Sequence, residues 1–374
     1  MRRFWNFYLL MNLNFNYMKA LITAGGHGTR LRPITYTLNK HLVPVANKPL
    51  IFYALEKIAA CGVKDVGINI NPGDVSVQKA VGDGSRWNLR VTYIEQKGGP
   101  KGLSHIILNA KSFLGESDFI FYLGDNIILG EINHLVESFY AEKADCLLSL
   151  AKVRDPQRFG VPEFNEKNEL IKVIEKPSSP KSDFAVTGIY IYNKSIMEAV
   201  ENIFPSQRGE LEISDAHQYL LDHNFKVKFK EITGWWKDTG KPEDLLEGNQ
   251  LLLNNIQSEN LAEEISADSR MQGNIKIGKG TKILGNTFLR GPIVIGNDCL
   301  IKDSYIGPFT SLGNNVKISK AEVEHSIVFD EAEICCKRRI IDSLIGLKAQ
   351  VKDSENSLPS GNKLIVGDNS YIEI

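Results

Sequence analysis

A glycine-rich stretch near the start of the chain, LITAGGHGTRLRPITYTLNK at residues 21–40, has the composition of a phosphate-binding loop. Gly25, Gly26 and Gly28 follow an apolar run that begins at Met18, and glycines there let backbone N–H groups approach a ligand closely. A P-loop would require G-x-x-x-x-G-K-[ST], which is absent. A dinucleotide fingerprint would require a further glycine where this chain has Arg and Leu. The stretch therefore predicts a nucleotide-wrapping loop of another kind.

Two cations follow these glycines. Arg30 comes at the exit of the loop, and its planar guanidinium suits bidentate binding of triphosphate oxygens. Lys40 is a compact charge that suits a reacting phosphoryl group, and Pro33 and Pro44 stiffen the path around it. Taken alone, the same residues also fit a solvated basic turn. The rest of the domain must decide between the two interpretations.

The loop and seven later segments resemble, in order, the signature of the sugar-1-phosphate nucleotidylyltransferase family. The loop reads G-G-x-G-T-R-L-x-P and continues as NKHLVPVANKPL. The later segments are YIEQKGGPKGLSHIIL (93–108), FYLGDNII (121–128), RFGVPEF (158–164), IEKPSSP (174–180), FAVTGIYIYN (184–193), RGELEISD (208–215) and WWKDTG (235–240). Within the family, the chain is most similar to the long thymidylyl-transferring members, which carry a hexapeptide-repeat C-terminal domain.

The resemblance implies transfer of dTMP from dTTP to glucose 1-phosphate, with attack by the sugar phosphate on the α-phosphorus and release of pyrophosphate. A phosphate monoester is already anionic near neutral pH, so no general base has to generate the nucleophile. The barrier arises because two anions must meet in line, which calls for charge neutralisation and positioning. The required residues are therefore cations, metal ligands, and groups that hold the sugar and the base.

Two aspartates are the candidate metal ligands. Asp125 follows an apolar strand, and a carboxylate at the carboxyl edge of a sheet commonly meets a ligand. Asp238, in WKDTG, is the second candidate. Two carboxylates together with substrate phosphates suit Mg2+, which prefers oxygen ligands and keeps some of its waters. A single loop aspartate is more often a turn former or helix cap, but the neighbouring motifs favour the metal role here.

The resemblance also implies contacts to the sugar phosphate. Lys176 and Arg208 would bind its phosphate and act with Arg30 and Lys40 as the catalytic cations. The sugar pocket would comprise Gly160, Glu175 and Val186. For Glu175 and Lys176 the alternative is a surface ion pair, which contributes little to stability.

For the nucleotide, the resemblance implies that Gln96 reads the pyrimidine edge with its amide and that Gly102 gives the base room. The remaining contacts would come from the loop, at Ala24, Gly25, Gly26, Gly28 and Thr29. The chain departs from the family pattern in GGPKGLSH, where relatives usually have Pro-Leu-Gly-Leu-Ala, and in Phe159, where some carry Tyr. We interpret His27 as a loop-surface residue, and Trp235 and Trp236 as site wall or core.

Alternating strand-like and helix-like segments must position these residues. Apolar runs occur at 20–24, 66–70, 90–96, 119–124, 146–153 and 187–193, with helical patterns between them such as PLIFYALEKIAACG at 49–62. This alternation predicts a mostly parallel, three-layer α/β sheet, the Rossmann-like architecture expected of a nucleotidyltransferase domain.

A different pattern follows residue 265. Aliphatic residues recur every six positions, and glycines often follow them directly. The anchors are Ile277, Ile283, Leu289, Ile295 and Ile301, then Ile306, Leu312 and Ile318, then Val328, Ile334 and Ile340, then Ile345 and Val351. This period is typical of a left-handed parallel β-helix, whose triangular coils stack these side chains. The final residues lose the period and are expected to cap the stack.

These patterns divide the chain into four parts. Residues 18–245 form the predicted nucleotidyltransferase domain, residues 246–264 a linker helix, and residues 265–374 the β-helix with its cap. Residues 1–17 superficially resemble a signal peptide, but asparagines interrupt the apolar run and no small-x-small cleavage site follows. We therefore expect residues 1–17 to be an extension outside the fold.

The composition of the chain limits the kinds of partner and cellular compartment that can be expected. The 374 residues include 44 Lys and Arg against 45 Asp and Glu, a balance that suggests neither nucleic acid nor a membrane surface as a partner. No segment is long and apolar enough to span a bilayer. The five cysteines show no C-x-x-C spacing, which argues against a disulfide framework or a zinc site and favours a cytoplasmic setting.

Rival functions remain at this stage. A bifunctional acetyltransferase would need a histidine base, and only His325 follows residue 250. A non-catalytic regulator would be expected to lose cations or aspartates that this chain retains. A uridylyl or guanylyl transferase acting on glucose or mannose 1-phosphate stays open. We expect a homo-oligomer in which the β-helix contributes to assembly.

Overall fold

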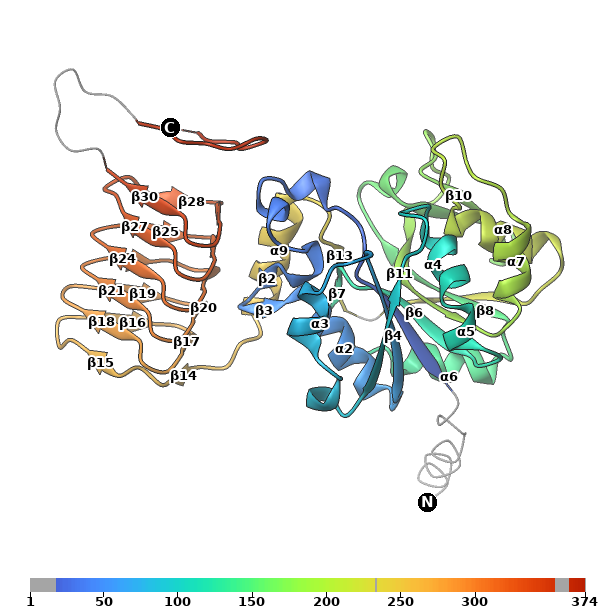
Figure 1. Ribbon diagram of the computed structural model, residues 1–374, viewed down its shortest axis with the longest axis horizontal. Coiled ribbons are helices and arrows are strands. Elements are labelled where there is room, and N and C mark those ends of the chain that lie inside the picture. The colour runs from blue at the N-terminus through green and yellow to red at the C-terminus, as the bar shows by residue number, and fades with distance from the viewer. Residues whose placement is uncertain (1–17, 233, 354–362, 374) are drawn as a thin grey trace. The chain divides into compact units, whose positions relative to one another are not determined.

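The computed structural model describes residues 18–232, 234–353 and 363–373. The chain forms two compact units (Figure 1). The first contains the residues up to Gly26 together with Ile51–Asp238, and the second contains His27–Leu50 together with Thr239 onward. The predicted N-terminal extension, residues 1–17, lies outside the described residues.

A seven-stranded sheet in the order β12-β8-β11-β6-β1-β4-β5 forms the centre of the first unit. Its strands are β1 (Lys19–Thr23), β4 (Asp65–Ile70), β5 (Arg90–Glu95), β6 (Phe119–Leu123), β8 (Cys146–Lys152), β11 (Phe184–Tyr192) and β12 (Val227–Glu231). β11 runs antiparallel to β6 and β8, and the other neighbouring pairs are parallel. The predicted mostly parallel α/β sheet is therefore confirmed.

Helices bury the apolar strands of this sheet. They are α2 (Leu50–Ala60), α3 (Ser76–Val81), α4 (Leu103–Asn109), α5 (Lys111–Leu114), α6 (Asn133–Ala141), α7 (Ile196–Asn202) and α8 (Ile213–Asp222). Side chains of α4, α5, α7 and α8 share one core with β6, β8 and β11. Nearly every residue of β6 and β8 is buried, as expected for strands covered on both faces.

Two small antiparallel pairs extend from the main sheet and carry predicted site residues. β9 (Gly160–Phe164) pairs with β10 (Leu170–Glu175), and β7 (Asn126–Ile128) pairs with β13 (Trp236–Asp238). β9 and β10 are neighbours in the chain, whereas β7 and β13 come from segments far apart in the sequence, and both pairs set the registers described below.

Three parallel sheets form the C-terminal part of the second unit, as a left-handed β-helix requires. The first has β14 (Glu259–Asn260), β17 (Ile275–Ile277), β20 (Ile293–Ile295), β23 (Thr310–Leu312), β26 (Ile327–Val328) and β29 (Leu344–Ile345). The second has β15 (Glu264–Ile265), β18 (Lys282–Leu284), β21 (Leu300–Lys302), β24 (Lys317–Ser319), β27 (Glu333–Cys335) and β30 (Gln350–Lys352). The third has β16 (Arg270–Gln272), β19 (Phe288–Arg290), β22 (Tyr305–Ile306), β25 (Glu322–Glu324) and β28 (Ile340–Ile341).

The predicted anchors form three interior stacks, one for each sheet. Ile277 pairs in register with Ile295, and the stack continues through Leu312, Val328 and Ile345. The other two stacks contain Ile283, Ile301, Ile318, Ile334 and Val351, and Leu289, Ile306, Val323 and Ile340. Val323 is not among the predicted anchors. All belong to one apolar core or pack against it. The β-helix prediction is thus confirmed.

The second unit also contains residues 27–50 and helix α9 (Pro242–Leu253). The segment holds the short 3-10 turns η2 (Thr29–Leu31), η3 (Ile34–Tyr36) and η4 (Lys40–Leu42), followed by β2 (Pro44–Val45) and β3 (Lys48–Pro49). The compact units therefore do not coincide with the division expected at residue 245, which falls inside α9. The difference arises because residues 27–50 pack with α9 and the β-helix.

The described part of the expected cap, residues 363–373, has every residue exposed. Residues 354–362 lie outside the described residues. The five cysteines are free thiols. Across the described ranges, none of the helices has the length and apolar character needed to cross a membrane.

Candidate active site

The residues predicted to bind the nucleotide in the first unit lie where β1 ends. Gly25 lies against three amide side chains: a Cβ there would be 2.9 Å from Asn69, 3.1 Å from Asn71 and 3.2 Å from Gln96. Gln96 is buried, with its Oε1 3.4 Å from Asn69 Nδ2. Asn71 bonds Gly26 twice, accepting from its N–H at 3.0 Å and donating to its carbonyl at 3.2 Å. The structure therefore brings Gln96 beside Gly25 and Asn71 beside Gly26.

Gly102 approaches another part of the backbone closely. Its φ is +95°, and a Cβ there would lie 2.5 Å from the Leu211 carbonyl oxygen. Two hydrogen bonds hold the same junction, from Ser104 N–H to the Leu211 carbonyl and from Leu211 N–H to the Lys101 carbonyl. The glycine is thus required for contact with the RGELEISD segment, a reason that the sequence pattern did not indicate.

The two predicted metal ligands meet through strand pairing. In the β13–β7 pair, Asp238 is the register partner of Asn126, which directly follows Asp125. The Asn126 amide donates to Asp125 Oδ1 at 2.9 Å and accepts from the Trp236 indole N–H at 2.6 Å. Trp236 is buried, so it belongs to the core and positions this pair.

The buried phenol of Tyr190 on β11 is influenced by three carboxylates of the predicted site. Complete burial raises the pKa of its phenol, and the charges of Glu175, Asp125 and Asp238 raise it further. These three carboxylates therefore lie within electrostatic range of the same buried phenol. The described residues contain no group of three or more His, Cys, Asp or Glu side chains arranged for a metal. Two neighbouring aspartates fit Mg2+, which takes its other ligands from water and substrate phosphates.

The predicted sugar pocket assembles around Gly160. β9 and β10 place Gly160 directly opposite Glu175. A Cβ at Gly160 would lie 2.9 Å from Ser214 Oγ, 3.5 Å from Glu175 Oε2 and 3.7 Å from the Val186 Cβ. Ser214 in turn donates to Glu175 Oε2 at 2.7 Å. The structure brings these predicted residues together, and the lack of a side chain at Gly160 keeps the space beside the carboxylate open.

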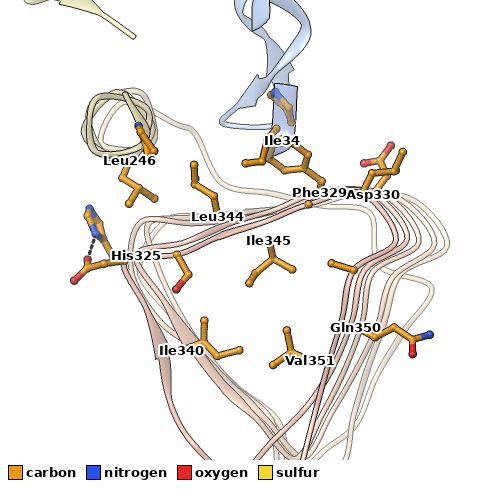
Figure 2. Close-up of a pocket in the computed structure, with 18 of the residues that line it drawn as sticks. Ile34, Leu246, His325, Phe329, Asp330, Ile340, Leu344, Ile345, Gln350 and Val351 are labelled. Atoms are coloured by element: carbon orange, nitrogen blue, oxygen red, sulfur yellow. Dashed lines mark hydrogen bonds and ion pairs between the residues drawn. The ribbon is translucent and has the colours of Figure 1, made fainter. Parts of the chain in front are cut away.

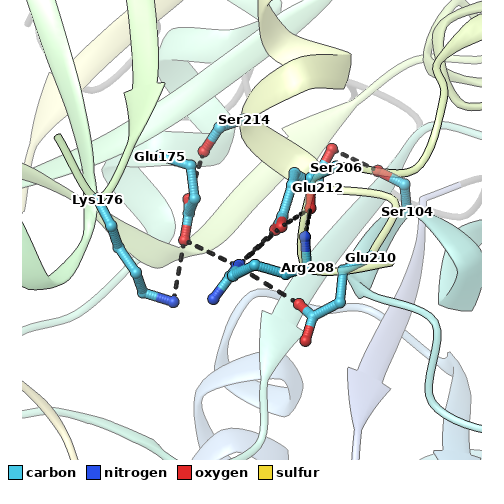
Figure 3. Close-up of polar contacts among 8 residues, drawn as sticks. All are labelled: Ser104, Glu175, Lys176, Ser206, Arg208, Glu210, Glu212 and Ser214. Atoms are coloured by element: carbon cyan, nitrogen blue, oxygen red, sulfur yellow. Dashed lines mark hydrogen bonds and ion pairs between the residues drawn. The ribbon is translucent and has the colours of Figure 1, made fainter.

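Arg208 lies among the carboxylates of Glu175, Glu210 and Glu212 (Figure 3). Its Nε donates to Glu212 Oε1 at 3.1 Å, and its Nη2 lies 2.8 Å and 2.9 Å from the two oxygens of Glu212. Glu210 and Glu175 are farther from Nη2, at 3.4 Å and 3.7 Å. Lys176, whose φ is +42°, places its Nζ 3.3 Å from Glu175 Oε1. The ion pair considered from the sequence exists, but it is part of a larger cluster of cations and carboxylates.

The remaining predicted residues lie in the second unit. Gly28, with a φ of +55°, packs against Thr35 and Lys40, and a Cβ there would lie 3.0 Å and 3.1 Å from them. Thr35 Oγ1 donates to the Gly28 carbonyl at 2.7 Å. Lys40 is buried, whereas Thr29 and Arg30 are exposed. His27 is also exposed, as its interpretation as a loop-surface residue predicts.

Comparison with known proteins identifies the family. Residues 19–255 match the nucleotidyl transferase family. The chain belongs to this family.

Relatives match this nucleotidyl transferase over almost its whole length. A glucose-1-phosphate thymidylyltransferase from Streptomyces griseus is 46% identical over 96% of this chain and 99% of its own. A low-salt glycan biosynthesis nucleotidyltransferase from Haloferax volcanii is 40% identical over 96% of this chain and 100% of its own. A crystal structure of a Bacillus anthracis protein assigned as glucose-1-phosphate thymidylyltransferase, in complex with sucrose, superposes with a TM-score of 0.60. It is 35% identical and covers 65% of this chain and 98% of its own.

Several residues of this nucleotidyl transferase site escaped sequence reasoning. Asn71, Asn126, Glu212 and Ser214 each bond a predicted site residue or its neighbour. Three of them lie inside quoted motifs, LGDN and RGELEISD, so their positions were visible but their partners were not. Asn71 follows β4 outside any quoted motif. Only its position just beyond a strand end was available as a signal.

His325, the candidate base of the acetyltransferase alternative, lies in the β-helix. Its Nδ1 is 2.5 Å from Asp342 Oδ1, a contact drawn as a dashed line at His325 in Figure 2. Its ring packs edge-on against Phe309. The pair joins successive coils, which gives the histidine a structural role on this face.

Proposed function

We propose that the chain is a glucose-1-phosphate thymidylyltransferase, which transfers dTMP from dTTP to glucose 1-phosphate and releases pyrophosphate. The observation that carries this proposal is the 46% identity to the Streptomyces griseus enzyme over 96% of the chain. The cluster of Glu175, Lys176 and Arg208 beside Gly160 supports it, because a sugar phosphate needs cations for its phosphate and a carboxylate for its hydroxyls.

In this proposal Lys176 and Arg208 bind the phosphate of glucose 1-phosphate, and Glu175 accepts hydrogen bonds from the hexose. Arg30 and Lys40 bind the triphosphate, with Arg30 on the departing pyrophosphate and Lys40 on the phosphates that meet. Ala24, Gly25, Gly26, Gly28 and Thr29 wrap the nucleotide, and Gln96 and Gly102 serve the base. Val186 lines the sugar pocket. These cations offset the repulsion between two anions and hold them in line.

We propose Mg2+ as the cofactor, held by Asp125 and Asp238. The register that brings these aspartates together supports the assignment. When bound, the ion neutralises phosphate charge at the reacting centre. Asn126 and Trp236 keep the first carboxylate oriented through the hydrogen bonds described above.

We further infer a cytoplasmic homo-oligomer in which the β-helix contributes to assembly. Five free cysteines, four of them buried with thiol pKa values raised by burial, fit a reducing compartment. The exposed Leu300 and Ile341 on open β-helix faces offer apolar surface for subunit contact. Neither nucleic acid nor membrane is expected as a partner.

The test is pyrophosphate release by the purified full chain. We expect the highest kcat/KM with dTTP and glucose 1-phosphate among dTTP, UTP, GTP, CTP and ATP, each paired with several sugar 1-phosphates including mannose 1-phosphate. A preference of about tenfold, or ~1.4 kcal/mol, for UTP or GTP over dTTP would overturn the assignment of the nucleotide. Consumption of acetyl-CoA with an amino-sugar 1-phosphate would instead reveal a second activity.

A further inference from the structure

The segment that carries Arg30 and Lys40 belongs to the same compact unit as the β-helix. Residues 27–50 group with Thr239 onward, although most of the first unit separates them along the chain. The segment ends in the β2–β3 hairpin, whose tip residues Ala46 and Asn47 have φ values of 48° and 60°. The contacts that anchor this hairpin therefore bear on where the two cations lie.

Asn249 of α9 is the centre of that anchorage. Its side chain is completely buried. Oδ1 accepts from the Ala46 N–H at 2.8 Å and from the Ser311 hydroxyl at 2.6 Å, and Nδ2 donates to the Phe309 carbonyl at 2.8 Å. Donors on one side and a carbonyl on the other fix the orientation of the amide. A single side chain thus joins the hairpin, the helix and the β-helix.

Asn47 adds a direct bond from the hairpin tip to the β-helix. Its Nδ2 donates to the Leu312 carbonyl at 2.5 Å. Ser311 and Leu312 both belong to β23, and Phe309 directly precedes that strand. The hydrogen bonds of Asn47 and Asn249 therefore converge on one strand, in the middle of the first β-helix sheet.

Burial shows that this face of the β-helix is covered. The outward side chains of Val294, Ser311 and Ile327 on successive coils are at most 6% exposed. On the other two sheets, the outward Leu300 and Ile341 are 38% and 53% exposed. The hydrogen bonds around Asn249 are thus shielded from water, which increases the cost of breaking them.

The covering side chains come from the segment and from α9. Ile34 and Leu246 lie on the outer side of this face, where Phe329 and Leu344 are also found, whereas Ile345 points into the coil (Figure 2). Leu246 and Phe329 are buried. Apolar contact therefore accompanies the hydrogen bonds over the same face.

Short connections link the hairpin and α9 to the two cations, Lys40 and Arg30. The Val43 N–H donates to the Lys40 carbonyl at 3.1 Å, and the Leu50 N–H donates to the Val43 carbonyl at 3.2 Å, so the hairpin base continues into the turn of Lys40. The Arg30 guanidinium lies against Gly240, where a Cβ would be 3.0 Å from both terminal nitrogens. Gly240 comes just before α9 in the chain.

We propose that the β-helix positions the catalytic cations, with Asn249 and Asn47 as the positioning residues. They hold residues 27–50 through β23 and α9, and so fix the places of Lys40 and Arg30 for the reaction. This inference rests on the roles that the proposed function gives to those two cations. It assigns the β-helix a part in phosphoryl transfer itself, because misplacing a catalytic group by about 1 Å can cost ~100-fold in rate.

Two variants of the full chain test the proposal. Asn249→Leu keeps the size of the side chain and removes its hydrogen bonds. Asn47→Gly removes the Leu312 bond, and glycine tolerates the positive φ there. Thr281→Val is the matched control, because Thr281 is equally buried and its side chain bonds the Gly296 carbonyl and Cys299, within the β-helix.

We expect Asn249→Leu to lower kcat about tenfold and Asn47→Gly about threefold, with KM for glucose 1-phosphate unchanged within about twofold. Thr281→Val should lower the melting temperature while leaving kcat within about twofold of the parent. Equal losses of rate in Thr281→Val and Asn249→Leu would overturn the proposal, as would a normal kcat in Asn249→Leu.

Hydrogen exchange gives a readout that does not depend on the substrates. Amides of residues 27–50 should exchange faster in Asn249→Leu than in the parent, and at the parent rate in Thr281→Val. Unchanged exchange of these amides in Asn249→Leu would refute the proposal that Asn249 holds residues 27–50 against the β-helix. If the parent chain turned over neither dTTP nor glucose 1-phosphate, the proposed function would fail while the exchange experiment still decided whether the β-helix holds the segment.

Discussion

At the scale of residues, carboxylates hold a cation of this site in place before any substrate binds. Glu212 is the main partner of Arg208, because its buried carboxylate meets both Nε and Nη2 and also accepts from Ser206 Oγ at 2.8 Å. Glu210 makes one longer contact from an exposed position. Exposed ion pairs contribute little, whereas a buried carboxylate with several donors fixes the orientation of its partner.

Glu212→Gln should therefore raise KM for glucose 1-phosphate about tenfold, since a charged hydrogen bond contributes roughly 1.5–3 kcal/mol. KM for dTTP should stay within about twofold of the parent, because Glu212 acts through Arg208. Steady-state kinetics with each substrate varied in turn would measure both values. Glu210→Gln is the matched control and should change neither KM by more than about twofold. A tenfold effect in the control, or none in Glu212→Gln, would show that this buried contact does not orient Arg208.

The paired aspartates give a second prediction at this scale. Asp125→Asn and Asp238→Asn should each lower Mg2+-dependent turnover by about 100-fold or more, because an amide is a much weaker ligand for a hard cation than a carboxylate. Rates measured across a Mg2+ titration would distinguish weaker metal binding from a loss of fold. Near-normal rates in both variants at ordinary Mg2+ concentrations would reject the metal assignment.

At the scale of elements, α8 links the site to the core. It begins immediately after Glu212, carries Ser214 in its first turn, and buries His217 on its inner face. His217 Nε2 lies 2.7 Å from the Tyr192 hydroxyl of β11, and its buried Nδ1 has no hydrogen-bond partner in the described part of the chain. Burial lowers the pKa of His217 from 6.5 to about 3, so the native protein keeps this ring neutral.

This histidine predicts an acid-sensitive stability. The unfolded chain binds a proton at His217 below pH 6.5, whereas the native chain does not until about pH 3. The free energy of unfolding therefore decreases as the pH is lowered from 6.5 towards 3. The loss from this group should be about 2 kcal/mol between pH 7 and pH 5. Urea denaturation of His217→Gln at several pH values should show a shallower pH dependence than the parent. An identical pH dependence in the two proteins would show that His217 is not the titrating group.

At the scale of the whole molecule, the two units differ in both architecture and spectroscopic signal. The first is a sheet with crossover helices, and the second stacks coils whose stability comes from neighbouring repeats. The three tryptophans among the described residues, at positions 87, 235 and 236, belong to the first unit. Tryptophan fluorescence therefore reports on the first unit, while circular dichroism reports on both.

Ile318→Ala should test the independence of the units. Ile318 is 1% exposed and stacks between Ile301 and Ile334, so its truncation should cost about 2–5 kcal/mol in the β-helix. We expect the dichroism transition in urea to move to lower concentration while the fluorescence transition stays in place. Movement of both transitions together would show that the two units unfold as one.

Much of this architecture was predictable from local pattern. The alternation of apolar strands and helices predicted the parallel sheet, and the six-residue period predicted the interior β-helix stacks except for Val323. Both predictions succeed because burial of one face imposes its period on the sequence. The order of the motifs likewise indicated the family and named Asp125, Glu175 and Arg208 before any coordinates were available. Such features depend on residues close together in the chain.

Only the tertiary structure decided which distant residues touch. The sequence by itself determined two architectures, a family and a set of charged side chains. It did not determine that Asp238 pairs beside Asp125, that Ser214 occupies the space a Cβ at Gly160 would need, or that residues 27–50 join the β-helix through Asn249. These contacts depend on strand register and on close packing between segments far apart in the chain, and no local periodicity encodes such distances.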